Sequence, residues 1–196
     1  IFYHCVRKVQ QRLPYAHEIQ TRWESELIAQ VIAYIKQMDA VVQPTETLYI
    51  GVDGVAPMAK IKQQRARRFK SAVAAAEEGR IKAEARGMPY IPQPRWDTNA
   101  ITPGTKFMEA LATALRTYAT TNPKRILVSP ADEPGEGEQK IMAWVRKARP
   151  RDVVVYGLDA DLIVLALWAT ATENITVDLF REETEFNGAI KEDPLG

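Results

Sequence analysis

Three groups of acidic residues in this sequence have the types and spacing that chemistry with divalent cations requires. The first is Asp53 in VDGV, the second is the run EPGEGE, and the third is the pair in GLDAD. Their acidic members are Asp53, Glu133, Glu136, Glu138, Asp159 and Asp161. Ionised carboxylates that lie close together repel one another unless a cation neutralises them or they take up protons. Because the donors are all oxygen, the pattern favours Mg²⁺ or Mn²⁺ over Zn²⁺.

Two hard cations bound close together are suited to phosphodiester hydrolysis. Two such ions about 3.5–4 Å apart can clamp a phosphodiester, one activating water and the other holding the leaving oxygen. Each acidic group also has a simpler interpretation when it is taken alone. An Asp after a strand is commonly a turn former, Asp161 could cap a following helix, and Glu136 or Glu138 could favour a helix N-terminus. The three groups together favour a metal-dependent nuclease.

A basic segment follows Asp53 directly. Six basic residues and no acidic residue lie between residues 60 and 70. If the segment is helical, four donors share one face because they recur at helical spacing: Lys60, Gln64, Arg67 and Arg68. Such a face beside a metal site suits a nucleic-acid phosphate. The alternative is a solvated basic surface.

The elements that must position these residues alternate along the chain. Apolar periodicity and turn signals predict helices at 1–12 and 22–40, from Pro57 to near Gly87, from Thr102–Pro103 to about residue 118, up to about residue 148, and at 162–171. Strands are predicted at 46–52, 124–129, 152–157 and 174–180. This order predicts an α/β fold with a mostly parallel sheet flanked by helices. Each acidic group then follows a strand, so the three groups should meet at one edge of the sheet.

Composition limits the class of protein. The chain has 196 residues, of which 46% are hydrophobic and 26% charged, with a net charge of +1, which predicts a single folded domain over residues 1–196. The one cysteine, Cys5, excludes a disulfide framework within the chain and fits a reducing, intracellular location, without distinguishing nucleus from cytoplasm. The longest apolar run, residues 162–171, is too short for a membrane span. Because residues 1–9 read as the inside of an element, we expect the true start of the chain to lie upstream of Ile1.

Four long motifs together resemble the XRN family of 5′→3′ exoribonucleases. They are YIGVDGVAPMAKIKQQRARRF, WDTNAITPGTKFM, EPGEGEQKIM and YGLDADLIVLAL, in the family's order. The resemblance implies a PIN- or flap-endonuclease-like nuclease core that uses two Mg²⁺ or Mn²⁺ ions. It implies hydrolysis of RNA with a 5′-monophosphate end and release of mononucleotides. It implies metal ligation by Asp53, Glu136, Glu138, Asp159 and Asp161, with Glu133 outside that set, and a 5′-phosphate pocket made of Lys60, Gln64, Arg67 and Arg68.

The sequence also departs from the family pattern. One family Asp would precede Ile1, another would follow Gly196, and Met58 stands where a basic residue is frequent. The family His that stacks on the 5′ base falls near Tyr3, with His4 adjacent; Tyr3, His4 and Trp96 are candidates for stacking, or alternatively core and surface filler. Two other functions stay open, namely a flap-type DNA nuclease and a non-catalytic RNA-binding relative. Protein partners are not indicated.

Overall fold

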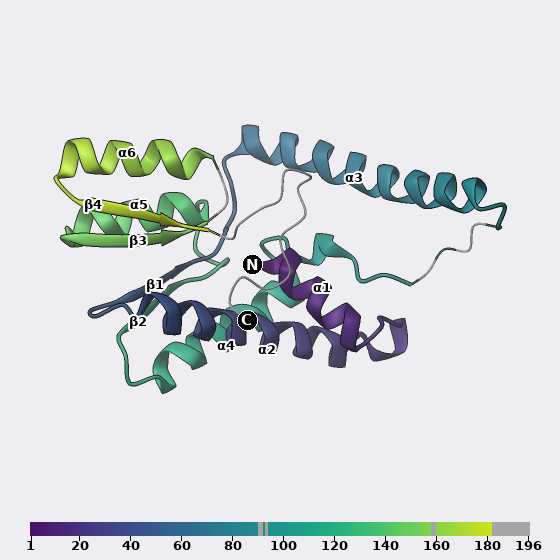
Figure 1. Ribbon diagram of the computed structural model, residues 1–196, viewed down its shortest axis with the longest axis horizontal. Helices are drawn as coiled ribbons and strands as arrows, with labels where there is room; N and C mark the ends of the chain where they lie inside the picture. The colour runs from purple at the N-terminus through teal and green to yellow at the C-terminus, as the bar shows by residue number, and fades with distance from the viewer. Residues whose placement is uncertain (90–91, 93, 158–159, 182–196) are drawn as a thin grey trace. The chain divides into compact units, whose positions relative to one another are not determined.

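The computed structural model describes residues 1–89, 92, 94–157 and 160–181, which fall in two compact units with a boundary between Glu136 and Gly137. The first unit contains α1 (Phe2–Arg12), α2 (Gln20–Val42), β1 (Leu48–Gly51), α3 (Met58–Ala85), α4 (Lys106–Thr121) and β2 (Ile126–Ser129), with short 3₁₀ turns at His17–Ile19 and Thr98–Ala100. The second contains α5 (Gly137–Ala148), β3 (Asp152–Tyr156), α6 (Asp161–Glu173) and β4 (Thr176–Phe180) (Figure 1). Every predicted helix and strand is confirmed in type.

The strands pair in parallel, as predicted. In the first unit β1 pairs with β2 from Leu48↔Ile126 to Gly51↔Ser129. In the second, β3 pairs with β4 from Asp152↔Thr176 to Tyr156↔Phe180. Each unit therefore has a two-stranded parallel sheet among the described residues, and helices connect the strands, which confirms the α/β class.

The core of the first unit is aromatic. Trp23 in α2 is fully buried, and its indole Nε1 donates a hydrogen bond to the carbonyl of Leu13 at 2.9 Å. Its ring centroid lies 5.2 Å from that of Trp96, which in turn meets Phe107 of α4 edge-on at 5.0 Å. Burial also raises the pKa of the Cys5 thiol in α1 to about 11, so that this cysteine stays protonated at neutral pH.

The second unit has its own core. Met142 of α5, Val155 of β3 and Leu162 of α6 are buried against one another, and Val153, Leu165, Val177 and Leu179 pack around them. Among the described residues, no helix has the length and apolar content that crossing a lipid bilayer would need.

The predicted start of the fourth helix is wrong. Thr102 and Pro103 precede the helix rather than begin it, because Gly104 has a φ of +88°, which is incompatible with a right-handed helix. The N-cap is Thr105, whose hydroxyl oxygen accepts a hydrogen bond from the Met108 amide at 3.3 Å. The helix therefore begins at Lys106.

Candidate functional site

The loops that follow β1 and β2 are hydrogen-bonded to each other. The Val52 amide donates to the carbonyl of Ser129 at 2.9 Å and so extends the strand pairing. Beyond it, the Gly54 amide donates to the Gly135 carbonyl at 2.8 Å, and the Gly135 amide donates to the Val55 carbonyl at 3.1 Å. Asp53 and Glu136, which neighbour these glycines, therefore belong to two loops fixed against each other.

Glycine is required at two positions of this junction. A Cβ atom on Gly54 would lie 1.8 Å from the backbone oxygen of Glu133, so the two loops could not approach as they do. Gly135 has a φ of +101°, a conformation that other residues rarely adopt. Gly54 and Gly135 therefore serve the contact between the loops.

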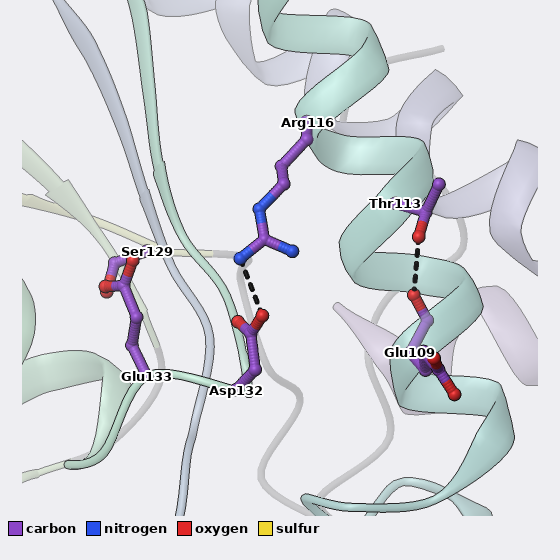
Figure 2. A network of polar contacts seen from close by, with 6 residues as sticks. All are labelled: Glu109, Thr113, Arg116, Ser129, Asp132 and Glu133. Carbon is purple, nitrogen blue, oxygen red and sulfur yellow. Dashed lines mark hydrogen bonds and ion pairs between the residues drawn. The ribbon is translucent and has the colours of Figure 1, made fainter.

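Further polar contacts fasten the loop after β2. The hydroxyl of Ser129, the last residue of β2, donates to a carboxylate oxygen of Glu133. Arg116 of α4 forms an ion pair with the carboxylate of Asp132 (Figure 2), with a nitrogen–oxygen distance of 2.7 Å. Glu133 thus interacts with the end of β2.

The basic helix α3 begins beside this junction. The carbonyl of Pro57, its N-cap residue, accepts hydrogen bonds from the amides of Lys60 at 2.9 Å and Ile61 at 3.1 Å. The Lys60 ammonium lies 2.6 Å from Oε1 and 2.7 Å from Oε2 of Glu136. A predicted phosphate donor and a predicted metal ligand are thus in direct contact.

The other predicted donors lie on the same helix. Gln64 and Arg68 are half-buried, one and two turns beyond Lys60, and α3 is continuous across them, so the three share a face. The side chain of Arg67 lies outside the part of the chain that the structure describes. The predicted single face of four donors therefore has three described members.

The second unit holds the remaining acidic residues. Glu138 is half-buried in the first turn of α5, and Asp161 is exposed at the first position of α6, after the N-cap residue Ala160. Negative side chains at these positions also interact favourably with the helix dipoles. Asp159 lies outside the described residues.

The candidates for base stacking have different surroundings. Tyr3 is 78% exposed, whereas the ring of His4 packs against Tyr34 of α2 with centroids 5.0 Å apart. Trp96 is buried in the aromatic core of the first unit. Of the three rings, that of Tyr3 is the most exposed.

The donor set fits a hard cation. Among the described residues, no group of three His, Cys, Asp or Glu side chains is close enough to hold a metal ion. Asp53 and Glu136 nevertheless offer carboxylate oxygens, the donors that Mg²⁺ and Mn²⁺ prefer. The ammonium of Lys60 already places a cation against both oxygens of Glu136. Of the oxygen donors that a hard cation would need, the described loop junction supplies these two carboxylates.

Some contacts of the site were not anticipated from the sequence. They are Lys60 with Glu136, Ser129 with Glu133, and Arg116 with Asp132. The one available signal was that a basic helix starts directly after Asp53, which predicts proximity of Lys60 to the strand ends but not its partner. The other two contacts depend on the path of the loop after β2.

Comparison with known proteins gives one family for the chain. Residues 1–183 match the family described as XRN 5′-3′ exonuclease N-terminus. The chain is 39% identical to 5′-3′ exoribonuclease 2 of Schizosaccharomyces pombe, over 88% of this chain and 20% of the relative. It is 40% identical to the 5′-3′ exoribonuclease 2 homolog of Caenorhabditis elegans, over 82% of this chain and 19% of that protein.

A third relative gives the same result. The 5′-3′ exoribonuclease 2 of Emericella nidulans is 39% identical over 83% of this chain and 18% of its own length, so that the chain spans only about a fifth of these curated relatives. Since the family match covers nearly the whole sequence and includes the paired strand-end loops and the basic helix, the chain belongs to the XRN 5′-3′ exonuclease family.

Proposed function

We propose that this chain forms part of the catalytic core of a Mg²⁺-dependent 5′→3′ exoribonuclease that degrades RNA carrying a 5′-monophosphate. The observation that carries the proposal is the junction of the two strand-end loops with the start of α3. It fixes the loops of Asp53 and Glu136 to each other and seats Lys60 on Glu136. Carboxylates and phosphate donors are thus adjacent, as hydrolysis next to a terminal phosphate requires.

The acidic residues would hold the cations. Asp53 and Glu136 would do so in the first unit, and the family resemblance assigns the same role to Glu138, Asp159 and Asp161. Bound Mg²⁺ would activate water and stabilise the leaving oxygen of the phosphodiester. Glu133 would keep the loop in place through Ser129 rather than act as a ligand.

The basic face of α3 would select the substrate end. Lys60, Gln64, Arg67 and Arg68 offer several donors to one phosphate, and charged donors bind phosphate more strongly than neutral ones. Because this face starts at the carboxylates, a terminal phosphate bound there would place the first phosphodiester next to them. An RNA without a free 5′ phosphate would lack this anchor, which accounts for the direction of degradation.

The direct test replaces Glu136 by glutamine in the complete protein. We expect E136Q to slow Mg²⁺-dependent release of mononucleotides from 5′-phosphorylated RNA by more than about a hundredfold, because even residues that only orient a metal ligand contribute about 10–100-fold. The matched control is E133Q in the same loop, whose amide oxygen can still accept from Ser129.

E133Q should retain nearly the wild-type rate. If E136Q retained it too, Glu136 would not be a metal ligand and the proposed site would be wrong. The same assay with DNA of identical sequence and 5′ end separates this function from that of a flap-type DNA nuclease, which would degrade the DNA at least as fast.

A further inference from the structure

Lys60 contacts Glu136 in a geometry that a cation-binding carboxylate would also offer to a metal ion. The ammonium lies between the two oxygens, 2.6 Å from one and 2.7 Å from the other. The Glu136 side chain is only 16% exposed, whereas that of Lys60 is 45% exposed. The carboxylate is therefore held in the loop junction, and the lysine reaches it from the solvent side.

A divalent cation and this ammonium exclude each other. Both would occupy the same side of one carboxylate, and their like charges repel at contact distance. The backbone of Lys60 is fixed by the first turn of α3, but its four-carbon side chain can rotate. An arriving cation would therefore displace the ammonium without moving the helix.

The displaced ammonium remains on the face of α3 that carries the other donors. Gln64 and Arg68 lie one and two turns further along the same face. A phosphate seated there gains the Lys60 ammonium only when Glu136 has another counter-ion. The Lys60 ammonium would thus move from the carboxylate to the phosphate: the divalent cation neutralises the carboxylate, and the lysine neutralises the phosphate.

We propose that Lys60 couples the two halves of the site: divalent-cation binding at Glu136 releases Lys60 to the 5′-terminal phosphate of RNA. This inference rests on the proposed function. By linkage, the cation strengthens binding of the phosphate and the phosphate strengthens binding of the cation by the same factor. The terminal phosphate therefore binds all of these donors, Lys60 included, only when the cation is bound.

The first experiment measures binding rather than cleavage. Fluorescence anisotropy with the complete protein gives the dissociation constants of one short RNA with a 5′ phosphate and with a 5′ hydroxyl. Both are measured with Ca²⁺ and with EDTA at constant ionic strength, because phosphate contacts depend on salt. For the wild type we expect the preference for the phosphate end to be at least about fivefold greater with Ca²⁺, at the lower end of typical coupling factors.

The second experiment uses K60M and a matched control, K62M, which removes the same charge from a residue two positions along α3 and off the shared face. In K60M, the preference for the 5′-phosphate RNA over the 5′-hydroxyl RNA should be the same with Ca²⁺ as with EDTA. K60M should also bind Mn²⁺ more tightly than K62M when no RNA is present, as measured from free Mn²⁺ by electron paramagnetic resonance, because the competing ammonium is gone.

Each result decides between the accounts. If the wild type binds both Mn²⁺ and the 5′ phosphate but neither affects the other, the coupling is wrong while the proposed function stands. Mn²⁺ binding by K60M that is equal to or weaker than that by K62M also overturns the coupling. If the wild type binds no Mn²⁺, or never prefers the phosphate end, both the coupling and the proposed function fail.

Discussion

Gly54 is the residue on which the approach of the two strand-end loops depends most. A side chain there would meet the backbone oxygen of Glu133 at 1.8 Å, and a backbone atom cannot rotate away as a side-chain tip can. Asp53 is its neighbour in sequence, so any separation of the loops also separates Asp53 from Glu136. Both the stability of the first unit and the geometry of the proposed site thus depend on Gly54.

We predict that G54A destabilises the protein by about 1–3 kcal/mol, the usual range for forced overpacking, and lowers exonuclease activity by more than stability alone explains. The urea midpoint and the cleavage rate below the unfolding transition check the two effects. The control is G157A in the second unit, where the added Cβ would meet side-chain rather than backbone atoms, namely Cδ1 of Leu162 at 2.2 Å and its Cγ at 3.7 Å. G157A should cost less, and a smaller loss for G54A than for G157A would contradict the role given to this close approach.

At the scale of residues, the sequence indicated which residues belong to the candidate site, but not which residues contact one another there. All three acidic groups were predicted to meet at one sheet edge because each follows a strand. The register of β1 with β2 brings the loops of Asp53 and Glu136 together, whereas the strand before the third group, β3, pairs with β4 in a sheet of its own. The ion pair of Lys60 with Glu136 depends on the path of a loop with no regular periodicity. No spacing rule covers two residues that far apart in sequence.

At the scale of elements, α4 shows how a cap determines where a helix begins. The pair Thr102–Pro103 has the form of an N-cap followed by a first helical proline, yet its backbone precedes the helix. Gly104 takes a positive φ, and Thr105 caps the amide of Met108 instead. Helical spacing predicted the body of the helix, but the pattern of Thr102 followed by Pro103 could not predict that Gly104 takes a positive φ and moves the cap to Thr105.

The cap gives an element-scale prediction. T105A should lower the free energy of unfolding by about 1 kcal/mol, the usual contribution of a threonine N-cap, whereas T105S should retain most of it. T113A is the control, since the hydroxyl of Thr113 bonds only the carbonyl of Glu109 in the middle of the same helix (Figure 2). Urea unfolding of the four proteins checks the order, and equal midpoints for T105A and T113A would refute the assigned cap.

At the scale of the whole molecule, the alternation of strands and helices was enough to predict an α/β fold. The apolar positions of α2 recur at helical spacing and are buried as expected, and both strand pairs are parallel. The sequence did not predict that the described residues form two compact units, with the boundary inside the acidic run after Glu136. That run reads as one loop, and only contacts distant in sequence assign its halves to different cores.

The central proposal is that the complete protein removes nucleotides from the 5′ end of RNA, and one measurement tests it most directly. An RNA labelled on its 5′ phosphate is incubated with the complete protein and Mg²⁺, and the labelled products are separated by length. The account predicts that the label appears at once as a mononucleotide, with no labelled product of intermediate length, and that a 5′-hydroxyl RNA labelled internally stays largely intact. A ladder of progressively shorter 5′-labelled RNAs, or internal cuts, would contradict it.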